Sequence, residues 1–208
     1  MIFKQLLLSG NYATNRLEAF SDGVFAIIIT LLILDIHTPE IHAVNNEKLF
    51  LGLIALTPKI LIYIISFLNI AVYWINHHQL FSVLKRTDRG FLWLNCLLLL
   101  VLVFVPFPTS VVGEYPDQII AITFFGLVMM VAAIIFGTMR LYSAYYGCLV
   151  NCDLIDDGLI KREMFKSYSG ALFYAVAILA GFISTKLSIA FYFVIPLLYA
   201  LPGKLDTL

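Results

Sequence analysis

Hydrophobic residues along this chain fall into six long stretches, which short polar segments separate. The stretches are residues 17–36, 49–83, 90–112, 118–146, 166–184 and 187–202. A helix of about 20 apolar residues crosses the roughly 30 Å hydrocarbon core of a bilayer, so each stretch is predicted to be a membrane helix. The second stretch is long for one crossing and contains Pro58, so we expect a single kinked or tilted helix that starts near the interface.

Composition agrees with this pattern and narrows the fold class. The 208 residues are 62% hydrophobic and 12% charged, with a mean hydropathy of +0.96. Soluble domains carry about 25% charged residues, so lipid must solvate much of this chain's surface. We therefore expect an all-α membrane protein with six transmembrane helices in a single domain, residues 1–208. The formal net charge is zero, which gives no indication of nucleic-acid binding.

The basic residues are distributed unevenly between the two sides of the predicted helices. One side holds Lys4, Arg16, Lys85, Arg86, Arg89, Arg140, Lys161, Arg162, Lys166 and Lys204. The other side holds two lysines and several acids, namely Lys48, Lys186, Asp35, Glu40, Glu47, Glu114 and Asp117. Because cytoplasmic loops carry the excess of Lys and Arg, both termini are predicted to be cytoplasmic, which agrees with an even number of spans.

The first predicted helix carries acids at membrane depth. Residues 16–35 read RLEAFSDGVFAIIITLLILD, with twelve uncharged residues between Asp22 and Asp35. The two carboxylates would lie only ~20 Å apart along a helix, which is less than the thickness of the hydrocarbon core. Charged groups at this depth pair with one another or face protein. We expect Asp22 to share a polar cluster with Arg16 and His77 at the cytoplasmic end.

The same helix has a distinct apolar face. At 100° per residue, one sector of about 100° collects a glycine, three bulky aliphatic side chains and one hydroxyl. The members of this sector are Gly23, Ile27, Thr30, Leu31 and Leu34. Asp22 points away from it. Two interpretations stay open here: a functional surface, or ordinary helix–helix core in which Thr30 bonds a carbonyl one turn back.

Histidine and cysteine chemistry is limited. His77 and His78 fit interface anchors, metal ligands or a proton relay. Cys148 and Cys152 have CxxxC spacing without a second Cys/His pair, so we predict no resident metal and no cofactor. Cys96 lies in an apolar run and is expected to be a small core residue. The sequence has no HExxH motif and no Gly-Ser nucleophile motif, so we expect no enzyme.

The motif of Arg16 followed by Phe20-Ser21-Asp22, the run GVFAIIITLLILD and the later His pair resemble the transmembrane protein 175 family. That family consists of potassium-permeable channels, and its bacterial members resemble homotetramers of one six-helix unit. The resemblance implies a bacterial inner-membrane protein in which the first helices of four copies line a central pore. It also implies that the Arg16, Ser21, Asp22 and His77 network ties the first helix to its neighbours.

The resemblance assigns roles to the residues of the apolar face. Ile27 is expected to be the narrowest point, Leu31 and Leu34 further apolar rings, and Thr30 the hydroxyl that contributes to ion selectivity through transient contact with K⁺. The sequence has no TVGYG-type filter, so we expect modest selectivity for potassium over sodium.

Three competing functions remain at this stage. The first is a proton-coupled transporter that uses Asp22 and His77 as a relay. The second is an intramembrane enzyme that uses the His pair, and the third is a non-conducting assembly protein whose apolar stripe only packs against other helices.

Overall fold

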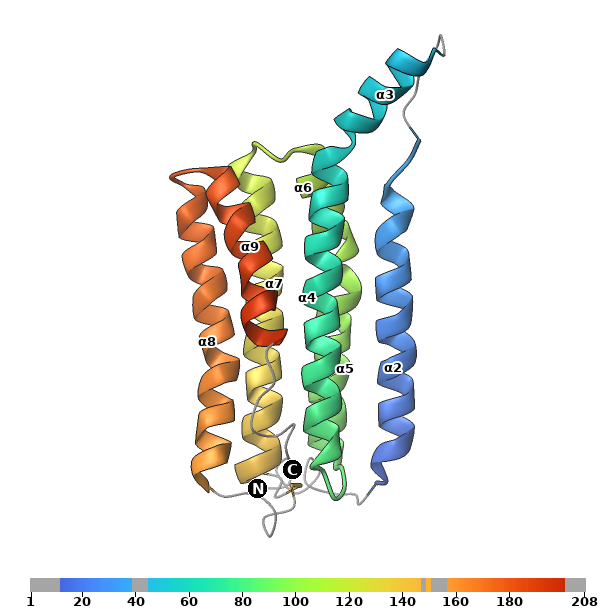
Figure 1. The fold of residues 1–208 in the computed structure, drawn as a ribbon. Coiled ribbons are helices and arrows are strands. Elements are labelled where there is room, and N and C mark those ends of the chain that lie inside the picture. Colours follow the sequence, from blue (N-terminus) through green and yellow to red (C-terminus); the bar gives the residue numbers. More distant parts are fainter. Residues whose placement is uncertain (1–11, 39–44, 147–148, 151–156, 201–208) are drawn as a thin grey trace.

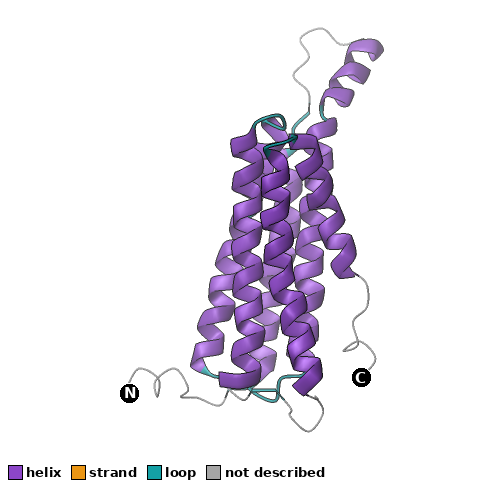
Figure 2. Cartoon of the chain, turned by 90° about the vertical axis from the view of Figure 1, so that its left-hand side faces the viewer, coloured by secondary structure: helices purple, strands orange, loops and turns teal. Residues whose placement is uncertain are grey.

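The chain forms an elongated bundle of roughly parallel and antiparallel helices (Figure 1). The computed structural model describes residues 12–38, 45–146, 149–150 and 157–200. The helices are α2 (Thr14–Leu31), the 3₁₀ turn η1 (Leu32–Asp35), α3 (Asn46–Ala55), α4 (Thr57–Ser82), α5 (Arg89–Phe104), α6 (Pro106–Glu114), α7 (Ile119–Leu141), the π-helical turn η2 (Tyr142–Tyr146), α8 (Asp157–Gly181) and α9 (Thr185–Ala200). All of them except α3 lie side by side in both views (Figure 2).

Four segments of the described chain are long and apolar enough to cross a bilayer. They are Thr14–Asp35, Thr57–Ser82, Arg89–Glu114 and Ile119–Tyr145. Two shorter apolar helices, Tyr168–Gly181 and Thr185–Ala200, complete the bundle. These elements confirm an all-helical, multi-pass membrane protein.

The expectation of a single helix over residues 49–83 is wrong. Two helices, α3 and α4, meet at Leu56, and α3 turns away from the bundle (Figure 1). Pro58 lies in the first turn of α4, where its missing N–H costs nothing, so the proline starts a new helix and does not kink a continuous one. The Thr57 hydroxyl completes the break by donating to the Ile54 carbonyl at 2.6 Å.

Other boundaries also differ from the hydrophobic stretches. The stretch 90–112 is divided at Val105, because Pro106 and Pro108 occupy the first turn of α6. Helix α8 begins at Asp157, nine residues before the apolar stretch that predicted it. Cys96 is exposed, so its expected place in the core is wrong; its neighbour Asn95 occupies the buried position instead. Cys148 and Cys152 lie outside the described residues.

Small residues allow α7, α8 and α9 to pack closely. A Cβ atom on Gly126 would lie 2.1 Å from the Tyr192 hydroxyl and 2.5 Å from Ile178. About three turns further along α7, a Cβ atom on Gly137 would meet the Tyr168 ring at 3.1 Å. Since lipid provides no hydrophobic drive between helices, such close van der Waals contact is what holds this half of the bundle together.

Hydrogen bonds between helices supplement this packing. The Tyr192 hydroxyl donates to the Ile122 carbonyl at 3.0 Å, and the Tyr73 hydroxyl donates to the Met129 carbonyl at 3.2 Å. Further bonds of this kind join Ser66 to Thr109, Asn69 to Tyr192, Tyr174 to Asn69, and Ser188 to Ala177. Buried polar side chains at membrane depth are thereby satisfied within the protein.

The two ends of the bundle differ in charge. The end at which α2 begins, here called the basic end, carries Arg16, Lys85, Arg86, Arg89 and Arg140. The opposite end carries Asp35, Lys59, Glu114, Asp117 and Lys186. There the Lys59 ammonium pairs with the Glu114 carboxylate at 2.5 Å and joins α4 to α6.

Candidate functional site

Helix α2 has one face buried in its own chain and one face that is open. The buried stripe packs against α4 and α5 and consists of Leu17, Ser21, Phe25, Ile28 and Leu32. On the open face the exposed fractions are 58% for Ile27, 40% for Leu31 and 65% for Leu34. A Cβ atom on Gly23 would meet nothing within 4 Å.

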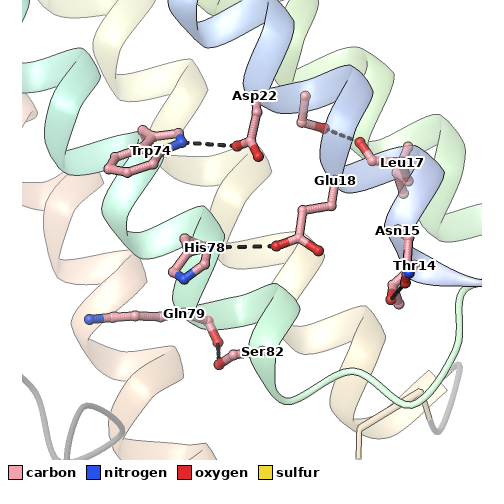
Figure 3. A network of polar contacts seen from close by, with 10 residues as sticks. Thr14, Asn15, Leu17, Glu18, Asp22, Trp74, His78, Gln79 and Ser82 are labelled. Atoms are coloured by element: carbon pink, nitrogen blue, oxygen red, sulfur yellow. Dashed lines mark hydrogen bonds and ion pairs between the residues drawn. The ribbon is translucent and has the colours of Figure 1, made fainter.

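This open face is the sector that the helical projection groups together. Ile27, Thr30, Leu31 and Leu34 are all exposed, so they are not core of their own chain. An apolar membrane-helix face of this kind contacts lipid, another copy, or a pore. The same geometry turns Asp22 toward α4 and away from the open face (Figure 3).

Thr30 is the hydroxyl on the open face. Its Oγ1 lies 3.0 Å from the Ala26 carbonyl oxygen and 2.9 Å from the Ile27 carbonyl oxygen, so its hydrogen is shared between two backbone acceptors. A threonine hydroxyl has one hydrogen and two acceptor lone pairs. Because the hydrogen points back along the helix, the oxygen lone pairs are not used by these two bonds.

Asp22 is bound to a residue of α4 that lies one turn away from His77. The Trp74 indole Nε1–H donates to Asp22 Oδ1 at 2.9 Å (Figure 3). One helical turn toward the basic end, His78 Nδ1 lies 3.6 Å from Glu18 Oε1, and the Trp74 and His78 rings are stacked with centroids 6.1 Å apart. These two contacts fasten the first turns of α2 to α4.

A separate, buried chain of hydrogen bonds connects α2, α5 and α4. The Ser21 hydroxyl donates to the Leu17 carbonyl at 2.8 Å, and the Asn95 amide donates to Ser21 Oγ at 3.0 Å. That orientation leaves Asn95 Oδ1 to accept from His77 Nε2 at 2.8 Å. His77 Nε2 therefore carries a hydrogen, and the buried Nδ1 atom has no hydrogen-bond partner among the described residues.

Aromatic rings enclose His77. Its ring stacks on Phe81 with centroids 4.3 Å apart and meets Phe25 edge-on at 5.4 Å. With no exposed surface, this histidine is a packed structural side chain and cannot reach the open face of α2.

The expected single cluster of Arg16, Asp22 and His77 is thus replaced by two separate arrangements. Asp22 bonds Trp74, whereas His77 reaches Ser21 through Asn95. Arg16 is exposed, and no hydrogen bond or ion pair joins it to another described residue. Asn95 was not predicted from the sequence. A lone asparagine in the apolar run FLWLNCLLLL is nevertheless a signal, because a polar side chain at membrane depth needs a partner inside the protein.

At its other end, α2 is held by Asp35. The Ser110 hydroxyl of α6 donates to Asp35 Oδ1 at 2.7 Å. The residues of the open face thus lie between two attachment points, the Trp74 and Asn95 contacts near the basic end and the Ser110 contact at the opposite end.

The fold and this site define a class: a multi-pass helical membrane protein whose first helix presents an open apolar face. A crystal structure of a lysosomal potassium-selective channel TMEM175 homologue from Chamaesiphon minutus superimposes with a TM-score of 0.81 at 37% identity, covering 90% of this chain and 96% of that one. A potassium channel of Chamaesiphon minutus is 39% identical over 194 residues, which is 90% of this chain and 94% of the relative.

A potassium channel of Streptomyces collinus is 36% identical over 190 residues, which is 89% of this chain and 91% of the relative. The family model described as "Endosomal/lysosomal potassium channel TMEM175" matches residues 16–106, which include most of α2 and all of α3, α4 and α5. The chain belongs to the TMEM175 family. It is therefore an ion channel of the membrane and not an enzyme.

Proposed function

We propose that four copies of this chain form a potassium-permeable channel whose central pore is lined by the open face of α2. The observation that carries this proposal is the exposure of Ile27, Leu31 and Leu34 on a helix whose opposite face is packed and hydrogen-bonded. The potassium channels to which the chain is similar over about nine-tenths of its length support it. Residues 1–208 act as one six-helix unit, and each unit contributes one pore helix.

Ile27 forms the narrowest ring of the pore, and Leu31 and Leu34 form further apolar rings. Water leaves a narrow apolar neck, and an ion without its hydration shell does not cross it. The neck therefore closes the pore by dewetting, and opening requires α2 to move outward at Ile27. No cofactor or resident metal takes part.

Thr30 gives the pore its preference among cations. Four Thr30 hydroxyls, each with its hydrogen directed to the backbone, present oxygen lone pairs to a K⁺ ion that pauses there. A single ring of hydroxyls has a weaker field than the stacked carbonyl rings of a TVGYG filter. Selectivity for potassium over sodium is therefore modest.

Two sets of contacts near the basic end of α2 support this arrangement from inside each subunit. The Ser21–Asn95–His77 chain and the Asp22–Trp74 bond hold the basic end of α2 against α4 and α5. Arg16, which the resemblance assigns to the same network, is exposed near the start of α2 and has no hydrogen bond or ion pair to another described residue. The bonded residues hold the pore helix in place and do not contact the permeating ion.

The protein lies in the bacterial inner membrane with both termini in the cytoplasm. The basic end of the bundle faces the cytoplasm, because Lys and Arg are retained on that side. The opposite end faces outward, where Asp35, Glu114 and Asp117 raise the local concentration of cations near the pore.

Reconstitution of the purified protein in liposomes, with a potassium-flux assay, tests this function. Ile27→Asn makes the neck polar and is expected to raise potassium flux severalfold, since a wet neck conducts. Leu179→Asn is the matched control, because Leu179 is 66% exposed on α8, away from α2. Unchanged flux in Ile27→Asn, or flux that saturates as exchange in the manner of a proton-coupled carrier, would contradict the proposal.

The carrier alternative is not favoured by the geometry. A relay through Asp22 and His77 needs the two groups in one hydrogen-bonded path, but Trp74 and Asn95 bind them separately.

A further inference from the structure

Helix α3 is apolar and well formed, but it makes few contacts in its own subunit, and those lie against α4. None of its residues is buried. Five large apolar side chains are each at least 40% exposed: Leu49, Phe50, Leu51, Leu53 and Ile54. The helix is nevertheless a defined element, because the Asn45 side chain caps it by accepting from the Lys48 backbone N–H at 2.8 Å.

The length of α4 indicates that α3 stands outside the hydrocarbon core. Helix α4 has 26 residues and is therefore ~39 Å long, already more than the roughly 30 Å hydrocarbon core. The Lys59–Glu114 ion pair stands at its first turn, and such a pair of charges is expected at the boundary of the hydrocarbon core. Helix α3 precedes that boundary in the chain and rises past the ends of all other helices in both views (Figures 1 and 2).

The direction of α3 identifies its partner. In Figure 1 the helix leans toward the side of the bundle on which α2 stands. A rotation axis that brings the open faces of several α2 helices together also brings their α3 helices together above the pore. Rotational symmetry of this kind repeats one contact around a closed ring. A second copy therefore reaches α3 without any rearrangement of the bundle.

We propose that the α3 helices of neighbouring copies pack on one another outside the membrane and form the wall of an outer vestibule. Exposed apolar patches of this size in water mark protein interaction surfaces, and here the partner is a second copy of this chain. Glu47 and Lys48, both exposed at the far end of α3, give each helix one charge of either sign. The Lys48 ammonium of one copy can therefore pair with Glu47 of the next, which sets the register of the ring.

This inference rests on the tetrameric channel proposed above, and the test separates the two. The full chain is prepared with Cys96, Cys148 and Cys152 replaced by Ala, and single cysteines are introduced along α3. The variants are Leu49→Cys, Phe50→Cys, Leu51→Cys, Gly52→Cys, Leu53→Cys and Ile54→Cys. Six consecutive positions sample every face of a helix with 3.6 residues per turn.

Each variant is reconstituted in liposomes and oxidised, and the products are separated by size under denaturing conditions. Disulfides need Cα atoms within about 7 Å of one another, so a cross-link reports direct helix contact. We expect disulfide-linked dimers at two or more positions that share one face of α3. We expect none for Leu179→Cys on α8, which is similarly exposed.

Native mass spectrometry of the same samples measures the oligomer independently. A tetramer without cross-linking at any α3 position would overturn the vestibule and leave the channel proposal intact. A monomer without cross-linking would overturn both. Quenching of a fluorophore on Phe50→Cys by brominated lipid would also overturn the vestibule, because α3 would then lie in the membrane surface.

Discussion

The hydrogen-bond chain through Asn95 should make α2 and α4 energetically dependent on each other. Asn95→Ala removes the acceptor of the His77 Nε2–H and the donor to Ser21 Oγ. An orphaned buried donor costs about 1–3 kcal/mol. Asn95→Ala removes two interhelical hydrogen bonds, and such bonds in membranes average about 0.6 kcal/mol each, so the expected loss lies at the lower end of that range, at about 1 kcal/mol.

A double-mutant cycle separates the free-energy cost of the unpaired His77 donor from the cost of lost packing. His77→Leu has similar volume and takes away the group that Asn95→Ala leaves without a partner. The double variant should therefore be more stable than the sum of the two single losses predicts, with a coupling of about 1 kcal/mol. Free energies of unfolding come from titration of detergent-solubilised protein with sodium dodecyl sulfate, followed by circular dichroism.

The control is a polar residue of α4 that shares no partner with Asn95. Ser66 bonds Thr109 on α6 at 2.8 Å, so Ser66→Ala combined with Asn95→Ala should be additive. If the Asn95–His77 cycle is additive to within about 0.5 kcal/mol, as expected of independent sites, the reasoning from a connected chain is refuted.

Three further outcomes follow from the same structure. Thr30→Ala should lower the potassium-to-sodium permeability ratio, measured from reversal potentials, while Thr30→Ser, which keeps the hydroxyl, should retain it. Asp22→Ala removes the acceptor of the Trp74 indole and should reduce the yield of assembled protein in size-exclusion chromatography with little change in that ratio; Trp74→Phe should do the same. Gly126→Ala would place a Cβ 2.1 Å from the Tyr192 hydroxyl and should destabilise the subunit by about 1–3 kcal/mol in the unfolding titration. A Gly126→Ala variant as stable as the unmodified protein would show that α7, α8 and α9 are less closely packed than described.

Much of the fold was predictable from hydropathy, because lipid solvation forces apolar residues into long runs. The runs located the four long spans and the two shorter helices, with α2 and α7 close to their predicted ranges. Helix α8 begins earlier than predicted because its first turns, DGLIKREM, contain several charged residues alongside good helix formers such as Leu, Lys, Arg, Glu and Met, and a hydropathy pattern does not detect such a segment. The sequence predicts a change of backbone at Pro58, but whether a proline kinks a helix or starts a new one depends on the tertiary structure around it.

The candidate site was predictable in part, for a related reason. Helical periodicity groups residues on one helix, and it correctly separated Ile27 and Thr30 from Asp22. It does not say which residue of another helix stands opposite. Asp22 consequently meets Trp74 in place of His77, and Asn95 completes the chain to Ser21.

Helix α2 meets its own subunit along one stripe, on α4 and α5, while α7, α8 and α9 pack mainly among themselves and behind those two helices. The residues that fold the subunit and those that would meet the ion are therefore separate sets. Sequence drift in the rear helices would reach the proposed conduction path only by displacing α4 or α5. A substitution in α7, α8 or α9 that keeps α4 and α5 in place should therefore leave the proposed permeation surface unaltered.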